Sequence, residues 1–229
     1  MAEQRIKLNK MRRMIGENMR QSNINNPRTA GSVQLDFTEL LEMKAELADK
    51  GHKVSDTAIF VWAIARALKD HPKLNSRLEG EEMIIYDEIN PGIAVDTPRG
   101  LLALTLRNTE NKTLLEVSES FRDLMHRFKE GRLTMDDYTG STYTISNMTR
   151  SAVHFFTSII NNNECFIIGF GGIHKAPVVL EDGSIAARDV CFMTTNGNHV
   201  LVDGMETDNF TSQLQDILTH PKKYLEDNV

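Results

Sequence analysis

The order of the apolar segments constrains the fold of this 229-residue chain more than any other feature. Runs rich in Val, Ile, Phe and Thr, which are typical of strands, are interleaved with segments that have helical spacing. The two kinds do not alternate strictly, which argues against a doubly wound parallel sheet. The sequence therefore predicts an α/β fold with a mixed β-sheet and helices packed on one face.

Five segments have the periodicity or the end signals of helices. Residues 55–70 have a broad apolar face, and Ser55 is a suitable N-cap, so we expect a core helix there. Residues 113–131 begin with a capping box formed by Thr113 and Glu116 and end at a glycine. The other three helices are expected at residues 8–22, 38–51 and about 205–218.

Strands are expected where short apolar or alternating runs are bounded by turn residues. Two of these boundaries, DTPRG at residues 96–100 and EDGS at residues 181–184, are typical of hairpin turns. The stretch NINNPRTAG, residues 23–31, is rich in turn formers. The expected strands lie within residues 32–37, 82–108, 141–146, 164–170 and 177–195.

Composition argues against several classes of function. Charged residues make up 25% of the chain and the formal net charge is -6, with no block of Lys or Arg suited to nucleic acid. No apolar run is long enough to span a membrane, and the charged N-terminal segment lacks the apolar core of a signal peptide. Cys165 and Cys191 each lie in an apolar run, so we expect buried free thiols in a cytoplasmic protein, without a disulfide or a metal site.

The sequence HVLVDG, residues 199–204, has the side chains best suited to catalysis. Histidine exchanges a proton near neutral pH, because its free pKa is about 6.5. Asp203 resembles the carboxylate of a catalytic triad, and Gly204 permits tight turning of the backbone before the last helix. The alternative is a structural histidine beside a strand, and these positions alone do not decide between the two.

Several stretches resemble one family, and they occur in the same order. HVLVDG fits the HxxxDG signature of the chloramphenicol acetyltransferase-like superfamily. HPKLNSRL and the early MRRMIGENM also have counterparts in dihydrolipoamide acyltransferases, the catalytic cores of 2-oxo acid dehydrogenase complexes. The longer stretches that resemble those enzymes are NPGIAVDTPRGL at residues 90–101, GSTYTISNMT at residues 140–149 and FTSIINNNECFIIGFGGI at residues 156–173.

This resemblance implies a single catalytic domain over residues 1–229, with a chloramphenicol acetyltransferase-like α/β fold assembled as a homotrimer. It implies an active site between subunits, reached by coenzyme A from one side and by a dihydrolipoyl group from the other. The implied reaction moves an acyl group between these two thiols. No metal ion, membrane or nucleic acid is implied.

The resemblance also implies the roles of single residues. His199 is the expected general base, and Ser146 of the neighbouring subunit is the expected hydrogen-bond donor to the oxyanion. Asp203 is expected to pair with an arginine of the N-terminal segment, Arg12 or else Arg13. This pair would hold the histidine loop in place.

Three further residues are candidates near the same site. Gly204 is expected to support the histidine loop. Asn147 and Asn198 are candidates for the wall of a substrate channel, although a turn role fits Asn147 equally well.

The chain departs from the family pattern around the site. The family usually reads Asp-His-Arg where this chain has Asn198, His199 and Val200, so two charges beside the histidine are missing. Changes of this kind alter how a catalytic side chain is oriented, and they leave the acyl group and the acceptor open. The other departures are Arg28, Ala103, Ser141 and Ser158.

The sequence shows neither a lipoyl domain nor a subunit-binding domain, so it is either a piece of a longer protein or a free-standing catalytic domain. In the second case a lipoyl group is expected to come from another chain. The expected partners are a lipoyl-carrying protein and dehydrogenase subunits. Two alternatives remain: a coenzyme A-dependent acyltransferase with a hydroxyl or another small thiol as acceptor, and an inactive trimeric scaffold. The presence of both His199 and Ser146 argues against the scaffold.

Overall fold

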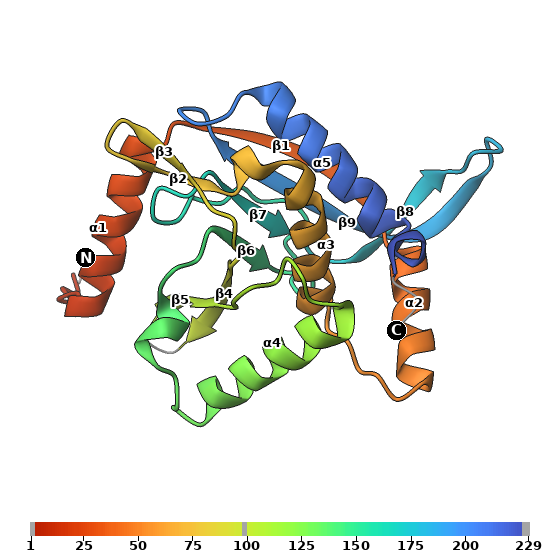
Figure 1. Cartoon of the computed structure of the whole chain (residues 1–229), viewed down its shortest axis with the longest axis horizontal. Helices are drawn as coiled ribbons and strands as arrows, with labels where there is room; N and C mark the ends of the chain where they lie inside the picture. The colour runs from red at the N-terminus through yellow and green to blue at the C-terminus, as the bar shows by residue number, and fades with distance from the viewer. Residues whose placement is uncertain (1–2, 98–99, 226–229) are drawn as a thin grey trace.

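The computed structural model describes residues 3–97 and 100–225, which form one large sheet, one small sheet and a layer of helices (Figure 1). The elements in chain order are α1 (Lys10–Asn25), β1 (Arg28–Asp36), α2 (Thr38–Asp49), α3 (Asp56–Asp70), the 3-10 helix η1 (Pro72–Leu74), β2 (Ser76–Glu79), β3 (Glu82–Ile85), β4 (Pro91–Thr97), β5 (Gly100–Thr105), α4 (Leu114–Lys129), η2 (Met135–Tyr138), β6 (Tyr143–Asn147), β7 (Phe166–Phe170), β8 (His174–Val179), β9 (Ile185–Asn198), α5 (Gly204–Thr219) and η3 (Pro221–Tyr224).

The large sheet has seven strands in the order β1-β9-β7-β6-β4-β5, with β8 paired to the first part of β9. The pairs β4·β6 and β6·β7 are parallel, and the other pairs are antiparallel. β9 is 14 residues long and pairs with three strands: β8 along residues 185–190, β7 along residues 193–197 and β1 along residues 190–198. The mixed sheet predicted from the sequence is confirmed.

Helix α3 lies at the centre of the hydrophobic core. The hydroxyl of Ser55 accepts a 3.2 Å hydrogen bond from the backbone N–H of Ala58, so the predicted N-cap is present. α4 and α5 pack against α3, and the ring of Phe60 stacks on Phe170 of β7 with the centroids 3.7 Å apart. A helix buried on most sides needs apolar residues around most of its circumference, which residues 55–70 have.

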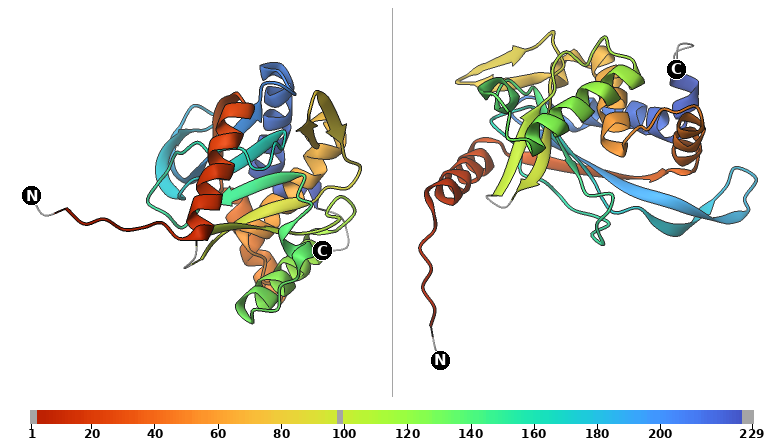
Figure 2. Two further views of the ribbon diagram at one scale, coloured as in Figure 1. Left: turned by 90° about the vertical axis from the view of Figure 1, so that its left-hand side faces the viewer. Right: turned by 90° about the horizontal axis from the view of Figure 1, so that it is seen from below.

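The helices α2, α3, α4 and α5 lie on one face of the sheet, while α1 stands apart at one end (Figure 2). Residues 3–9 extend away from the body ahead of α1, and the β8–β9 hairpin projects at the other end. Both projections expose apolar side chains, because Ile6 is 76% exposed and Ile185 is 72% exposed. Exposed apolar groups on projecting segments are typical of surfaces that meet another protein.

The face of the sheet away from the helices is crossed by an irregular segment, residues 151–164. The ring of Phe156 lies over Gly169, where an added Cβ would come within 2.8 Å of the ring. At Gly171 an added Cβ would lie 1.8 Å from the backbone oxygen of His154. The glycines of FIIGFGGI are therefore required by the close approach of this segment to β7 and its continuation.

The fold differs from the sequence-based expectation at two places. Residues 28–31, part of the stretch expected to form turns, are the start of β1, because they pair with the last four residues of β9. Residues 76–79, for which no strand was predicted, pair with β3 in a separate two-stranded sheet. The predicted EDGS turn is present, with Gly183 at a φ of 80°, whereas the DTPRG turn falls partly on residues 98–99, outside the described residues.

Among the helices of the described ranges, none combines the length and the apolar character needed to cross a bilayer.

Gly171→Ala should destabilise the fold by about 3 kcal/mol or more, because the new methyl group would collide with a backbone carbonyl that cannot rotate away. The measurement is the urea midpoint followed by circular dichroism. Gly16→Ala in α1 is the matched control, since a Cβ there meets no atom within 4 Å, and it should not lower the midpoint. Equal midpoints for the two variants would contradict the close approach.

Candidate functional site

His199 lies where β9 ends and the chain turns towards α5. Its backbone N–H donates a 2.8 Å hydrogen bond to the carbonyl of Pro27, which ties the loop to the start of β1. The imidazole is 46% exposed, and its Nδ1 lies 3.6 Å from Oδ1 of Asp203. The other ring nitrogen, Nε2, contacts no polar partner within the described residues, so it is available to a substrate.

Asn198, directly before the histidine, is fully buried and holds the loop from beneath. Its side-chain N–H donates to Oδ1 of Asn26 at 2.8 Å, and its own Oδ1 accepts from the backbone N–H of Val200 at 3.1 Å. Its backbone N–H donates to the carbonyl of Cys165 at 2.7 Å. In this chain Asn198 therefore positions the histidine loop, and it does not face open space as the wall of a channel would.

Asp203 and Gly204 mark the start of α5. The backbone N–H of Asp203 donates to Oε2 of Glu206 at 2.9 Å, and the Asp203 carboxylate is 85% exposed. A hydrogen bond from Lys73 lowers the pKa of Glu206 below its usual range. Gly204 does not have a left-handed φ, and an added Cβ would meet no atom within 4 Å. Within the single chain, Gly204 therefore does not provide the tight turn that the sequence predicted.

Arg12 does not reach Asp203 in the single chain. It lies in the first turn of α1, where its backbone N–H donates to the side chain of Asn9 at 2.8 Å. At a rise of 1.5 Å per residue, it lies about 20 Å along the helix from Asn26, which contacts the histidine loop. The contact predicted between Arg12 and Asp203 is therefore absent from the described part of one chain, and the same holds for Arg13.

Ser146 lies on β6 and points to the sheet face away from the helices. Successive side chains of a strand point to opposite faces, and the amide of Asn147 donates to Thr57 of α3 on the helix side at 2.9 Å. Ser146 is level with Gly169 of β7, which is level with Thr194 of β9. It is half-buried, and its hydroxyl makes no hydrogen bond to another residue in ranges 3–97 and 100–225.

Ser146 and His199 of one chain are too far apart to act on the same substrate atom. Ser146 is level with Thr194, and His199 lies five residues further along, which is about 17 Å at the usual rise of a strand. β7 lies between β6 and β9, which adds about 10 Å across the sheet. Proton transfer and oxyanion stabilisation need contacts of about 3 Å, so the two residues of one chain cannot act together on the same substrate atom.

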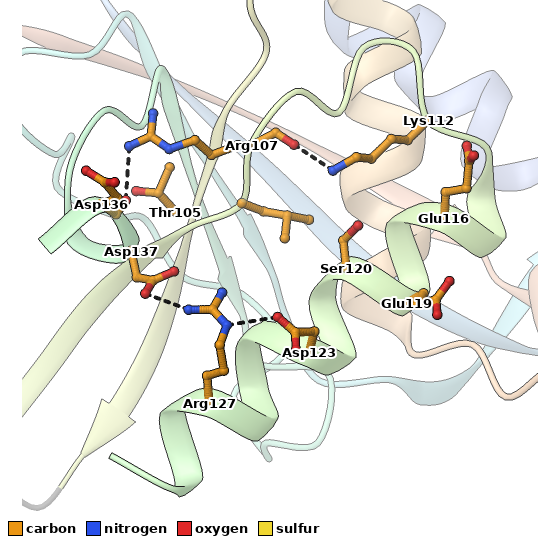
Figure 3. Close-up of a pocket in the computed structure, with 11 residues that line it drawn as sticks. Thr105, Arg107, Lys112, Glu116, Glu119, Ser120, Asp123, Arg127, Asp136 and Asp137 are labelled. Atoms are coloured by element: carbon orange, nitrogen blue, oxygen red, sulfur yellow. Dashed lines mark hydrogen bonds and ion pairs between the residues drawn. The ribbon is translucent and has the colours of Figure 1, made fainter. Parts of the chain in front are cut away.

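Two of the cavities among the described residues lie near residues considered above or hold several charges. One of about 520 Å³ is lined by Asn147 together with the first residues of α3, so Asn147 does face a cavity. The other, of about 670 Å³, lies between α4 and η2 (Figure 3). Its charges are partly used within the chain, because Arg127 pairs with Asp123 at 2.8 Å and with Asp137 at 2.6 Å. Neither cavity includes His199 or Ser146.

The two cysteines are buried free thiols. Burial raises the pKa of Cys165 and of Cys191 to about 12. A thiol that is protonated at neutral pH is a poor nucleophile, so neither cysteine suits a covalent role. Within the described ranges, no group of three or more His, Cys, Asp or Glu side chains could hold a metal ion.

The structure adds two residues that the sequence did not single out, Asn26 and Glu164. Asn26 is buried at the end of α1, and Glu164 is buried in the segment that precedes β7. Asn26 lies in a stretch rich in turn formers, where a buried asparagine and an exposed one look alike in sequence. Glu164 stands at the edge of an apolar run, where a charged residue is ordinarily expected in solvent.

The fold defines the class of protein first. A solved chloramphenicol acetyltransferase shares it with a TM-score of 0.56, over 88% of this chain and 94% of its own, at 17% sequence identity. The class is therefore a chloramphenicol acetyltransferase-like α/β fold.

The chain belongs to the family described as 2-oxoacid dehydrogenases acyltransferase (catalytic domain), whose profile matches residues 1–226. It is 31% identical over 232 residues to the dihydrolipoyllysine-residue succinyltransferase component of the mitochondrial 2-oxoglutarate dehydrogenase complex of Saccharomyces cerevisiae, covering 97% of this chain and 49% of that protein. The chain thus spans about half the length of that relative.

A solved dihydrolipoamide acetyltransferase of Azotobacter vinelandii is 25% identical, with a TM-score of 0.89 over 97% of this chain and 93% of its own. That structure and the chloramphenicol acetyltransferase confirm the predicted fold class.

Asn198→Ala should lower the free energy of unfolding by about 1–3 kcal/mol, because it leaves the buried Oδ1 of Asn26 without its hydrogen-bond donor. Urea denaturation at neutral pH measures the change. The exposed Asn111 is the matched control, and Asn111→Ala should change the same quantity by less than about 0.5 kcal/mol. An unchanged midpoint for Asn198→Ala would show that the amide pair does not support the histidine loop.

Proposed function

We propose that this protein moves an acyl group between the thiol of coenzyme A and a dihydrolipoyl thiol. The observation that carries the proposal is that one chain has two separate half-sites. Within residues 3–97 and 100–225, Nε2 of the exposed His199 has no polar partner, and the half-buried hydroxyl of Ser146, on the sheet face away from the helices, has none either. Membership of the acyltransferase family supports the reaction class.

We propose a homotrimer in which His199 of one subunit meets Ser146 of the next. The separation of the two residues along the sheet supports this, because a second subunit is needed to complete the site. In a closed ring the same pair of surfaces meets at every interface, so three equal sites form. The exposed apolar residues of the N-terminal segment and of the β8–β9 hairpin are available for such contacts.

His199 acts as the general base in this proposal. Nδ1 faces Asp203, so Nε2 accepts the proton from the incoming thiol. The resulting thiolate attacks the carbonyl carbon of the acyl thioester, and a new carbon–sulfur bond forms. The exposed Asp203 carboxylate attracts the imidazolium that exists at this stage.

Ser146 of the neighbouring subunit donates a hydrogen bond to the oxyanion of the tetrahedral intermediate. One such donor lowers the barrier by about 3 kcal/mol in other enzymes. When the intermediate collapses, the bond to the departing sulfur breaks, and the imidazolium of His199 returns the proton to that sulfur. No covalent enzyme intermediate is needed.

The Azotobacter vinelandii enzyme offers a parallel for these residues. A serine, a histidine and an asparagine four positions after that histidine were investigated there for their roles in the catalytic mechanism. Asp203 has the same spacing from His199 in this chain. We therefore keep Asp203 in the active site, and we assign Arg12, with Gly204, to the support of the loop in the assembled trimer.

The relatives indicate only in part which acyl group is transferred and which protein carries the lipoyl group. The yeast relative is a succinyltransferase and the Azotobacter vinelandii relative is an acetyltransferase, so both acyl groups belong in the first substrate panel. We propose that the dihydrolipoyl group is carried by a protein of a 2-oxoacid dehydrogenase complex. Buried free thiols support a reducing compartment, and we propose the cytoplasm.

His199→Ala should reduce acyl transfer from acyl-coenzyme A to dihydrolipoamide by about 10²–10⁴-fold. Ser146→Ala should reduce it by about 10²–10³-fold. The reason is that one variant loses the base and the other loses the oxyanion donor. Release of coenzyme A from acetyl- and succinyl-coenzyme A at neutral pH measures both. Wild-type turnover by His199→Ala would exclude the mechanism.

Co-expression of the two inactive variants tests the division of the site between subunits. In random mixed trimers, about one quarter of the interfaces would combine an intact His199 with an intact Ser146, so activity should return. Each variant alone is the control. If the mixture stays as inactive as its parents while trimers form, the two residues do not share a site across the interface.

A further inference from the structure

A buried carboxyl group lies between the two half-sites of each chain. Glu164 is 1% exposed and accepts hydrogen bonds from the hydroxyls of Ser141 and Thr144, both at 2.7 Å. The amide of Asn161 donates to it more weakly, at 3.4 Å. Thr144 lies two positions before Ser146 on the same face of β6, so this carboxyl group is fixed to the strand that bears the oxyanion donor.

The segment that contains Glu164 also holds the histidine loop. We call residues 160–165 the clamp segment. The carbonyl of Cys165 accepts from the backbone N–H of Asn198 at 2.7 Å, and Oδ1 of Asn163 accepts from the amide of Asn26 at 3.4 Å. At the other end of the segment, the carbonyl of Ile160 accepts a hydrogen bond from the hydroxyl of Ser22.

The clamp segment adopts a backbone that needs support. Asn162 and Asn163 are consecutive non-glycine residues in the left-handed region, with φ of 44° and 59°. Such residues persist where surrounding contacts hold them. The contacts here are the backbone hydrogen bond from Leu78 to Asn163, 3.0 Å long, and the side chain of Glu164, which is bound to β6.

Room for this carboxyl group and its donors comes from Gly92 of β4. An added Cβ at Gly92 would lie 3.0 Å from Cβ of Ser141 and 3.1 Å from Oγ1 of Thr144. The glycine of the NPGIAVDT stretch thus leaves space for the two hydroxyls that bind Glu164.

We infer that Glu164 is a positioning residue that couples the two half-sites of a subunit, by holding Thr144 on the strand of Ser146 and the clamp segment beneath the loop of His199. The inference rests on the proposed acyl transfer for its kinetic readout. Glu164 touches no substrate and acts through Thr144 and the clamp segment.

The groups around the Glu164 side chain are hydrogen-bond donors, so this position requires an acceptor. The hydroxyls of Ser141 and Thr144 and the amide of Asn161 all donate, so a carboxylate, which only accepts, satisfies all three. A leucine of similar size would leave those donors unpaired. A glutamine keeps one acceptor oxygen, and a hydroxyl can turn to accept from its amide, so it is the conservative replacement.

The kinetic test compares Glu164→Leu with Glu164→Gln. Glu164→Leu should lower kcat about tenfold to a hundredfold with little change in KM for acyl-coenzyme A, because small displacements of reacting groups have effects of this size. Glu164→Gln should restore most of the kcat. Glu119→Leu, an exposed glutamate of α4, is the matched control and should keep wild-type kcat.

A second readout does not depend on acyl transfer. The rate at which diethyl pyrocarbonate modifies His199, followed by peptide mass spectrometry, should change at least threefold in Glu164→Leu and not in Glu119→Leu. If wild-type protein transfers no acyl group, the proposed function fails, and this rate still decides the positioning role.

Thr144→Val separates the two connections. It removes the hydrogen bonds of the Thr144 hydroxyl with Glu164 at 2.7 Å and with the amide of Asn161 at 3.4 Å. The contacts of the clamp segment with Asn198 and Asn26 remain, so the variant should lower kcat and leave the modification rate of His199 unchanged. This variant also decides the matter if Glu164→Leu does not form trimers. Wild-type kcat in Thr144→Val, or wild-type kcat and modification rate in a folded Glu164→Leu, would overturn the inference.

The pH dependence of stability gives a further test of the same group. Burial raises the pKa of Glu164 from 4.5 to about 7, although the hydrogen bonds from Thr144, Ser141 and Asn161 oppose the shift. The Tyr143 phenol of β6, whose own pKa is raised by burial, interacts electrostatically with Glu164. Arg77 of β2 pairs with Glu164 through the backbone, and its side chain forms an ion pair with Glu79. Among the described residues 160–165, 22–26 and 92, no other side chain is charged.

The folded state binds this proton more tightly than the unfolded chain, so the stabilisation is present at low pH and is lost as pH rises towards 7. The Tm of wild type should therefore fall between about pH 5 and about pH 8 by more than the Tm of Glu164→Gln does. Parallel pH curves for the two proteins would show that the pKa of Glu164 is not raised in the folded state.

Discussion

The pairing of β9 with three neighbouring strands determines where the histidine lies. β1 and β7 fix the register of the second half of β9, so Asn198 is directed into the buried contact with Asn26, and the chain leaves the sheet at His199. On the opposite face of β9, which meets the helices, Thr195 accepts a 3.1 Å hydrogen bond from the hydroxyl of Thr211 of α5. A slip of one residue would exchange the two faces and break both contacts.

The same sheet keeps the two half-sites of a chain apart. Ser146 and His199 lie on strands joined through β7 by continuous backbone hydrogen bonds, so their separation cannot change without loss of the sheet. In the trimer that we propose, the geometry of a complete site depends on how one subunit docks on the next. Contacts that hold each half-site rigid within its own chain, such as those of Asn198 and Glu164, matter for this reason.

Much of this architecture could be predicted from the sequence, and the exceptions share a cause. The helix at residues 55–70, the capping box of Thr113 and the mixed sheet all follow from local patterns. The start of β1 and the role of Asn198 depend on partners more than 150 residues away, and a local pattern of turn formers or a single polar residue has no signal for them. The motifs predicted roles for His199 and Ser146, whereas the lack of contact between Arg12 and Asp203 in one chain needed the length and direction of α1.

The departures from the family pattern beside the histidine have a consistent physical meaning. Asn198 is fully buried and bound to the neutral amide of Asn26, where a charged side chain would need a buried counter-charge to offset its desolvation. Val200, which stands where the family usually has an arginine, is 53% exposed. The histidine loop is therefore held by neutral hydrogen bonds to buried atoms, and salt screens these far less than it screens a charged pair at the surface. Asp203 lies 3.6 Å from the ring and is largely in solvent, so its attraction to the imidazolium is modest in the single chain. In the proposed trimer, a neighbouring subunit that excluded water from the site would strengthen this attraction.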